Sequence, residues 1–277
     1  MTVEEIEPHG FCGGVKRAIE MARAVLAERN FPDGARVCCL HELVHNETVV
    51  DELRNGGMMF ARTVEEVPEG AVLLISAHGA SPADCSAAKR KGVRIVDATC
   101  PFVAAAHEKI RENFRAGMRT VVEGDPSHAE VRGYLGEDGA CLPGDVKRGE
   151  VVGRVVQTTL DAGEHEGVCT ATRDRQRAVL AFVEGRRNAG MKVGVLVVGS
   201  AGSANTRRLA EIAERAGACA WRVASAEEVD RAAFGGLDVL GVTSGASTPD
   251  GLFKEVVSCV AERSSVVEFT PMKKEKK

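Results

Sequence analysis

The chain has 277 residues, of which 44% are hydrophobic and 27% are charged, and its formal net charge is −4. This is the composition of an ordinary globular protein that is long enough for two or three small domains. The slightly acidic balance and the presence of one Trp and one Tyr argue against nucleic acid and membrane surfaces as partners, because such partners require basic patches or stacking aromatic side chains.

Taken in chain order, short apolar runs alternate with stretches of helical spacing such as "VKRAIEMARAVLAER" (15–29) and "NTRRLAEIAERAG" (205–217). The runs that predict strands lie at 35–40, 71–76, 93–98, 119–124, 153–158, 192–199 and 237–243. This alternation is typical of an α/β protein with mostly parallel strands. In such sheets ligands gather at the carboxyl ends of the strands, so we expect the functional residues where strands lead into helices.

The beginning of the chain, "MTVEEIEPHG", is acidic and lacks the charged-then-apolar order of a signal peptide. No apolar run reaches the roughly 18 residues that a membrane span needs. We therefore expect a cytoplasmic protein whose thiols stay reduced. The nine cysteines are odd in number and form no C-x-x-C pair, which argues against a disulfide framework, thioredoxin-type chemistry and a zinc ribbon.

Three cysteines share one local setting, the point where a helix is predicted to begin. They are Cys12 in "HGFCGGVKRAI", Cys100 in "DATCPFV" and Cys169 in "GVCTATRDRQ". A helix N-terminus presents free N–H groups and a partial positive charge, and both stabilise a thiolate. Three thiolates without a fourth indicate either zinc with an open position or an iron–sulfur cluster with one iron not held by cysteine. Their wide separation and the flanking glycines favour the cluster.

The competing interpretation is that these cysteines are small buried side chains, as free cysteines often are. We expect that role for four others: Cys38 and Cys39 within a predicted strand, Cys219 beside "ACAWRV", and Cys259 within a predicted helix.

Three histidines also lie at predicted strand exits or helix starts: His45 in "VHNETVV", His78 in "SAHGASP" and His128 in "PSHAEVR". Together they are expected to donate hydrogen bonds to an anion, while Glu130, two residues after His128, supplies a proton. A lone histidine is more often structural or exposed, and we expect that of His9, His107 and His165.

Two loops rich in small residues lead into predicted helices, "GSAGSANTRR" (199–208) and "GVTSGASTPDGLF" (241–253). Their backbone N–H groups and hydroxyls, including those of Ser203 and Ser247, suit an anion at a helix start, as does the side chain of Asn205. Thr158 and Thr159 lie at another strand exit, in "VVQTTL". Neither loop is a Walker A or a G-x-G-x-x-G motif.

Read together, these segments resemble the LytB family of 4-hydroxy-3-methylbut-2-enyl diphosphate reductases, which catalyse the last step of the non-mevalonate isoprenoid pathway. The resemblance extends over roughly Gly10 to Leu252, and the matching motifs occur in the family's order. They are "GFCGGVKRAI", "VHN", "SAHG", "DATCP", "HAEV", "QTT", "VCTAT" with "RQ" following, "GSANTRRL" and "GASTPD".

The resemblance implies three small α/β domains around a central cavity that contains the cluster, with residues 13–98 in the first, 99–168 in the second, and 169–277 plus 1–12 in the third. It implies a [4Fe–4S] cluster held by Cys12, Cys100 and Cys169, with the fourth iron open to substrate. It also implies a one-electron donor such as ferredoxin or flavodoxin.

The same resemblance assigns roles to the polar residues. Glu130, Thr158 and His128 would be catalytic, with Glu130 as the proton donor. The residues that would bind the diphosphate of the substrate are His45, His78, His128, Thr158, Thr159, Ser203, Asn205 and Ser247. The products would be isopentenyl and dimethylallyl diphosphate.

The chain departs from the family pattern at three places. Ala129 stands where proline is usual, and Ala204 stands where serine is frequent. Between "QTTL" and Cys169 only the eight residues "DAGEHEGV" remain, too few for the helix and strand expected there. This trimmed second domain leaves two alternatives open: a non-catalytic iron–sulfur redox or sensor protein, and a zinc protein using three cysteines and a histidine.

Overall fold

The computed structural model describes residues 1–28, 36–261 and 266–269. The chain divides into two compact units. The first consists of Met1–Cys12, Thr159–Glu164 and Val168–Lys277, and the second consists of Gly13–Thr158 and His165–Gly167. Within the described residues, no helix combines the length and the apolar character needed to cross a membrane.

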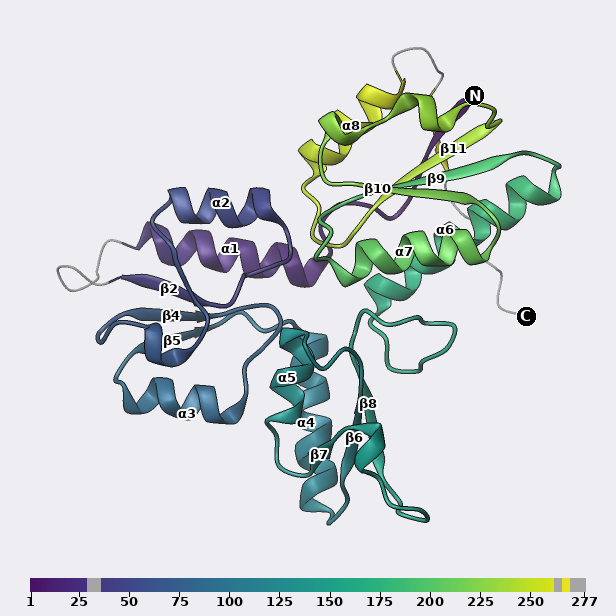
Figure 1. The fold of residues 1–277 in the computed structure, drawn as a ribbon. Helices are drawn as coiled ribbons and strands as arrows, with labels where there is room; N and C mark the ends of the chain where they lie inside the picture. Colours follow the sequence, from purple (N-terminus) through teal and green to yellow (C-terminus); the bar gives the residue numbers. More distant parts are fainter. Residues whose placement is uncertain (29–35, 262–265, 270–277) are drawn as a thin grey trace. The chain divides into compact units, whose positions relative to one another are not determined.

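The first unit is built on a five-stranded sheet in the order β10-β9-β11-β1-β12, and all neighbouring strands run parallel. Its strands are β1 (Thr2–Ile6), β9 (Val193–Val198), β10 (Cys219–Val223), β11 (Val239–Ser244) and β12 (Val266–Phe269). Its helices are α6 (Thr170–Asn188), α7 (Ala204–Arg215) and α8 (Asp250–Ala261). Figure 1 shows α6 and α7 on one face of this sheet and α8 on the other.

Strand β9 explains why this sheet needs helices on both faces. Val193, Val195 and Val197 pack into one core with α6 and α7, while Leu196 and Val198 pack into a second core with α8. Successive side chains of a strand point to opposite faces. A strand that is apolar at every position is therefore buried on both sides, as parallel strands usually are.

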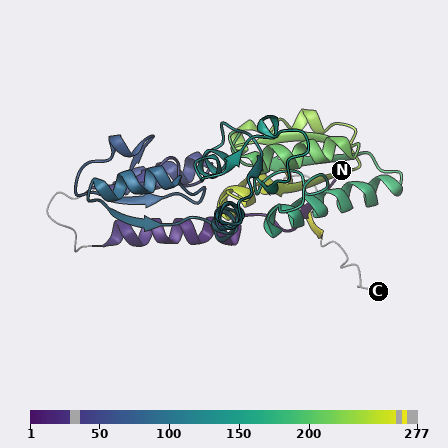
Figure 2. The same cartoon turned by 90° about the horizontal axis from the view of Figure 1, so that it is seen from below.

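The second unit contains two parallel sheets, in the orders β3-β2-β4-β5 and β7-β6-β8. The strands are β2 (Val37–Leu40), β3 (Met59–Ala61), β4 (Val72–Ile75), β5 (Arg94–Asp97), β6 (Thr120–Glu123), β7 (Ala140–Cys141) and β8 (Gly153–Val156). The helices are α1 (Gly13–Ala27), α2 (Glu47–Asn55), α3 (Pro82–Arg90), α4 (Pro101–Arg115) and α5 (Ala129–Leu135). Figures 1 and 2 show α1 and α3 on opposite faces of the four-stranded sheet.

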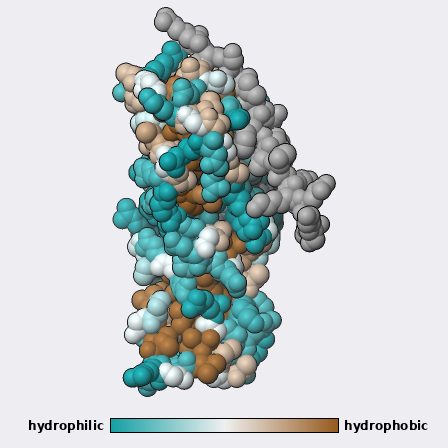
Figure 3. All heavy atoms as spheres, turned by 90° about the vertical axis from the view of Figure 1, so that its right-hand side faces the viewer, coloured by the Kyte–Doolittle hydropathy of each residue, from teal (hydrophilic) through white to brown (hydrophobic). Residues whose placement is uncertain are grey.

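Helices α4 and α5 cover the three-stranded sheet. Ile110 of α4, Tyr134 of α5 and Val122 of β6 are all fully buried in one cluster. Figure 3 shows mostly hydrophilic side chains on the face that it presents, with hydrophobic residues gathered at its lower end, where this small sheet lies. Val151, just before β8, is 81% exposed.

The seven predicted strands are confirmed, with ends that differ from the predicted ones by at most two residues. Among the strands that the apolar runs did not predict is β1, which lies between β11 and β12 inside a sheet. Its sequence, "TVEEI", looks too acidic for that place, yet Glu4 is buried there and pairs with Arg186 of α6.

The expectation for the structural cysteines is confirmed for Cys38 and Cys39, which are completely buried in β2. It is wrong for Cys219, which is exposed. This residue opens β10, the strand at the edge of its sheet, so one side of its backbone has no neighbouring strand to cover it. Cys259 in α8 is only partly buried.

The trimmed segment contains no helix or strand between β8 and α6, as its length predicts. Two side chains of the first unit hold it. Gln176 Nε2 donates to Leu160 O at 2.8 Å, and Ala162 N donates to Gln176 Oε1 at 2.7 Å. Arg215 of α7 pairs with Asp161 and with Glu164. Four contacts thus hold this segment to the first unit.

The predicted division into three domains stays a prediction. The strands of each sheet do fall within one of the three predicted segments. The compact units, however, group both small sheets into the second unit.

Candidate functional site

Each of the three predicted cluster cysteines precedes a helix. Cys100 is the N-cap residue of α4, with Pro101 as the first helical residue. Cys169 is the N-cap residue of α6, and its Sγ accepts from Thr172 N at 3.4 Å. Cys12 directly precedes α1. None of the three forms a disulfide, and all three are of intermediate exposure.

Cys12 and Cys169 belong to the first unit, whereas Cys100 belongs to the second. In the first unit, the backbone N–H of Cys12 donates to Ala246 O at 3.0 Å, which fixes the Cys12 loop to the loop that carries Ser247. A joint ligand set of all three cysteines stays a prediction.

His45, His78 and His128 come together in the second unit. One ring nitrogen from each lies within 4.8 Å of the others. The Nε2 atoms of His45 and His128 are 3.2 Å apart, and the ring centroids of His45 and His78 are 4.5 Å apart. Burial, followed by positive charge at His45 and His128, holds the pKa of His78 well below its ordinary value. The ring of His78 is therefore neutral at neutral pH.

Hydrogen bonds fix the tautomers of two of these rings. The Nδ1 atom of His128 accepts from Glu130 N at 3.3 Å and thereby caps α5. In the neutral ring the proton is then on Nε2, which faces His45. The Nδ1 atom of His45 lies 3.4 Å from Glu42 Oε2, which favours a proton there and a lone pair on Nε2. The capping bond thus holds the His128 Nε2–H as a donor.

Glu130 is buried beside this group, with 2% of its surface exposed. Its Oε1 accepts from Thr158 N at 2.6 Å and from Tyr134 Oη at 3.0 Å, and its Oε2 accepts from Thr158 Oγ1 at 3.0 Å. Burial raises the pKa of Glu130, although these three hydrogen bonds oppose the shift. A carboxyl that keeps its proton to a higher pH than usual is suited to act as a general acid.

The remaining predicted residues lie in the first unit, apart from Thr158. Ser203 caps α7, and its Oγ accepts from Thr206 N at 3.3 Å. Asn205 is 6% exposed, and its buried Oδ1 has no hydrogen-bond partner. Ser247 is 7% exposed. A buried amide oxygen without a partner is costly, so the Asn205 side chain lies where a ligand would complete its hydrogen bonding.

The Ser203 and Ser247 loops approach each other closely. A Cβ atom on Gly245 would lie 2.2 Å from Thr206 Oγ1 and 3.4 Å from Ser203 Oγ. Only glycine fits at this position. Thr159, the last predicted binding residue, begins the short segment Thr159–Glu164 of the first unit and is partly buried.

The structure thus gathers the predicted residues in two groups, one in each unit. The second unit brings together His45, His78, His128, Glu130 and Thr158, and it also contains Cys100. The first unit holds Cys12, Cys169, Thr159, Ser203, Asn205 and Ser247. A single cavity formed by both groups stays a prediction.

Sequence reasoning missed Tyr134 and Glu42, which contact Glu130 and His45. For Tyr134 a signal was available. It is the only tyrosine of the chain, and it follows Glu130 by four residues, a spacing that places both on one face of a helix.

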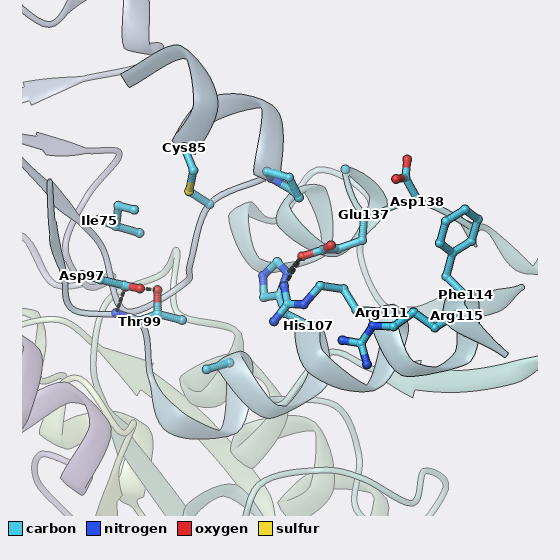
Figure 4. Close-up of a pocket in the computed structure, with 14 residues that line it drawn as sticks. Ile75, Cys85, Asp97, Thr99, His107, Arg111, Phe114, Arg115, Glu137 and Asp138 are labelled. Atoms are coloured by element: carbon cyan, nitrogen blue, oxygen red, sulfur yellow. Dashed lines mark hydrogen bonds and ion pairs between the residues drawn. The ribbon is translucent and has the colours of Figure 1, made fainter. Parts of the chain in front are cut away.

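A cavity of about 580 Å³ lies elsewhere in the second unit, beside α3, α4 and α5. Figure 4 shows His107, Arg111 and Glu137 directed toward one another along its wall. His107 Nδ1 and Arg111 Nη1 both lie 2.8 Å from Glu137 Oε1. His107 was expected to be structural or exposed, and it is structural: 6% of its surface is exposed, and the ion pair joins α4 to the end of α5.

Parallel sheets that alternate with helices define an α/β protein, and the predicted cysteines and polar side chains lie at or near its helix starts. The family model described as "LytB protein" matches residues 3–167 and 145–261. The chain therefore belongs to the LytB family.

Curated relatives agree with this family. The 4-hydroxy-3-methylbut-2-enyl diphosphate reductase of Escherichia coli O9:H4 (strain HS) is 36% identical over 283 residues, which cover 91% of this chain and 86% of that protein. The protein of the same name from Aeromonas hydrophila subsp. hydrophila is 34% identical over 294 residues, which cover 95% of this chain and 91% of that protein.

Two solved structures are similar over nearly the whole chain. The E-1-hydroxy-2-methyl-but-2-enyl-4-diphosphate reductase from Plasmodium falciparum has a TM-score of 0.88 at 25% identity, covering 100% of this chain and 94% of that chain. A second, (E)-4-hydroxy-3-methyl-but-2-enyl diphosphate reductase, described as the terminal enzyme of the non-mevalonate pathway, has a TM-score of 0.65 at 32% identity, covering 95% of this chain and 100% of that chain.

Proposed function

We propose that this chain is an iron–sulfur reductase that converts 4-hydroxy-3-methylbut-2-enyl diphosphate into isopentenyl and dimethylallyl diphosphate. Family membership and the named relatives support this function over a non-catalytic redox protein or a zinc protein. The structural observation that carries it is the buried Glu130, which has a raised pKa and hydrogen-bonds to Thr158 in the same unit as the three histidines.

The overall reaction needs two electrons and two protons. The allylic C–O bond breaks, the hydroxyl leaves as water, and a C–H bond forms at one of two carbons of the allyl group. The LytB family consists of iron–sulfur enzymes, and an iron–sulfur cluster supplies electrons one at a time. The protein must therefore bind the diphosphate and deliver protons.

The donors available in this chain fit a [4Fe–4S] cluster with three cysteine ligands. Cys12, Cys100 and Cys169 form no disulfide and lie at helix starts, where N–H groups and the helix dipole favour negative charge. The buried guanidinium of Arg175 lies in the first unit with Cys12 and Cys169, and its Nε has no hydrogen-bond partner. A buried cation without a carboxylate partner suits the negative charge of a thiolate-bound cluster.

The three histidines, Ser203, Asn205 and Ser247 are proposed to hold the diphosphate. The Nε2–H of His128 is a fixed donor, because the capping bond from Glu130 N occupies its Nδ1. Charge-assisted hydrogen bonds to phosphate oxygens are stronger than those between neutral groups. Phosphate charge near His78 also favours protonation of that ring.

Glu130 and Thr158 are proposed to form the proton path to the leaving hydroxyl. When Glu130 is ionised, the Thr158 hydroxyl donates to Oε2 across 3.0 Å. When Glu130 is protonated, its own O–H donates to Thr158 Oγ1, so the Thr158 proton is free to turn toward the substrate. Thr158 thereby passes on a proton, and Tyr134 keeps Oε1 in place.

A one-electron protein such as ferredoxin or flavodoxin is proposed as the donor, and a cytoplasmic location stays a prediction. Complementation tests the function directly. A bacterium that lacks its own reductase and survives on supplied isoprenoid precursors should grow without them when it expresses this chain. The Cys100→Ser variant, expressed at the same level, should not support growth. Failure of the wild-type chain, despite an intact cluster, would favour the redox or sensor alternative.

A further inference from the structure

Arg175 is a buried cation on α6 that contacts both the Cys12 loop and the first turn of its own helix, which follows Cys169. It lies on α6, six residues after Cys169, and 3% of its surface is exposed. Its Nη2 donates to Gly10 O at 2.8 Å and to His9 O at 3.5 Å, and its Nη1 donates to Ala171 O at 3.1 Å. Gly10 lies two residues before Cys12, and Ala171 lies two residues after Cys169. One guanidinium therefore contacts the backbone beside both thiols.

The positive charge of Arg175 has no carboxylate counter-ion. The ion pairs among residues 1–28, 36–261 and 266–269 do not include it, and its contacts are all to carbonyl oxygens. Its Nε atom is buried without a hydrogen-bond partner. Burying an unpaired charge is strongly unfavourable. A guanidinium needed only to hold three carbonyls would carry this cost without compensation.

The negative charge that would offset this cost is that of the cluster proposed at the two cysteines. Burial lowers the pKa of Arg175, while the Cys12 and Cys169 thiolates raise it, and they do so more strongly than Glu7 or Asp174. The geometry agrees, because the bonds to Gly10 O and Ala171 O hold the guanidinium beside backbone that is two residues from Cys12 and two residues from Cys169.

We propose that Arg175 is a positioning residue whose fixed positive charge raises the reduction potential of the cluster bound by Cys12 and Cys169. This inference rests on the proposed function, since it requires the cluster at these cysteines. One-electron reduction adds one negative charge to the cluster. A nearby cation in a medium of low dielectric stabilises the reduced state more than the oxidised state. Loss of that cation therefore lowers the potential.

The test is a redox titration of the anaerobically purified holoenzyme, followed by electron paramagnetic resonance and visible absorption. Arg175→Gln removes the charge, and Arg175→Lys keeps it but loses the planar fork. Arg177→Gln is the matched control, because it removes the same charge from an exposed position on the same helix. At a fixed potential, the ratio of reduced to oxidised cluster should fall at least tenfold in Arg175→Gln, which corresponds to 59 mV for a one-electron couple.

Arg175→Lys should stay much closer to the wild-type potential than Arg175→Gln, and Arg177→Gln should match the wild type. A wild-type potential in Arg175→Gln would overturn the inference. If Arg175→Gln does not fold, Arg175→Lys provides the test. A tenfold fall in its ratio of reduced to oxidised cluster would refute the role of the charge, because Lys keeps that charge. If neither variant assembles a cluster while Arg177→Gln does, Arg175 is needed for structure and not for the potential. If the wild-type protein itself holds no cluster, the proposed function fails instead.

Discussion

Replacing Glu130 with Gln separates proton delivery from structure. All three hydrogen bonds to the Glu130 carboxyl have a counterpart in the amide. Gln Oε1 accepts from Thr158 N and Tyr134 Oη, as Glu130 Oε1 does at 2.6 and 3.0 Å. Gln Nε2 takes the place of Glu130 Oε2 and donates to Thr158 Oγ1. The 3.0 Å hydrogen bond in which Thr158 Oγ1 donates to Glu130 Oε2 is thereby reversed in direction. Binding and folding should therefore be preserved, while no proton is available for transfer.

A positioned general acid contributes about 10²–10⁴-fold to the rate, which corresponds to about 2.7–5.4 kcal/mol of activation free energy. Turnover of 4-hydroxy-3-methylbut-2-enyl diphosphate by Glu130→Gln should fall by this factor. The iron content and the affinity for pyrophosphate should stay within about threefold of the wild type, because no contact is lost. Glu123→Gln is the control, because it removes a partly exposed carboxylate that pairs with Arg154 and His165 outside the site.

The pH dependence gives a second comparison. Because burial raises the pKa of Glu130, the wild-type rate should fall as the pH rises through that raised pKa. The pH–rate profile of Glu130→Gln should not show this fall. The folded protein binds this proton more tightly than the unfolded chain does. Stability from Glu130 is therefore present below the unfolded pKa and lost as pH rises through the folded pKa. The Gln variant should become more stable relative to the wild type at high pH. Wild-type turnover by Glu130→Gln would refute the assignment.

Three further outcomes follow from the site and the trimmed segment. Serine at any one of the three predicted cluster cysteines should lower the bound iron and the visible absorption, while serine at the exposed Cys219 should change neither. A variant that keeps the wild-type iron content would show that the replaced cysteine is not a cluster ligand. His78→Ala should weaken pyrophosphate binding, measured by calorimetry, about tenfold or more, whereas His165→Ala should not. In the wild type, pyrophosphate binding should be accompanied by proton uptake, because the pKa of His78 is low in the free protein and a bound anion raises it. Calorimetry in buffers of different ionisation enthalpy measures this uptake. Gln176→Ala breaks two hydrogen bonds of segment 159–164 and should lower the free energy of unfolding by about 1–3 kcal/mol. A free energy of unfolding within about 0.3 kcal/mol of the wild type would show that the segment does not depend on Gln176.

The strands and helix starts could be predicted because they depend on local patterns. The Val-rich run that forms β9 and the Ser81-Pro82 start of α3, which folds into a capping box, are examples. Strand β1 could not be recognised from its own sequence, because its place inside the sheet depends on pairing with β11 and β12. It also depends on an ion pair between Glu4 and Arg186, which is 182 residues away in the chain.

The same distinction applies to the site. Cys12, Cys100, Cys169 and Glu130 were identified because each lies near a predicted helix start. The hydrogen bond of Tyr134 to Glu130 and the hydrogen bonds of Arg175 to backbone carbonyl oxygens were not predicted, because they depend on how the side chains pack in the folded chain. Burial, which raises the pKa of Glu130, is likewise a property of the packed α5 and β8 region and not of the "HAEV" motif.

The central claim is tested most directly by product formation. Anaerobically purified protein is mixed with 4-hydroxy-3-methylbut-2-enyl diphosphate and a chemical one-electron reductant, and the diphosphate products are separated and identified by mass spectrometry against standards. We predict isopentenyl and dimethylallyl diphosphate in amounts that exceed the enzyme many times over, and none without reductant. Recovery of unchanged substrate from protein that carries a full cluster and binds pyrophosphate would contradict the account.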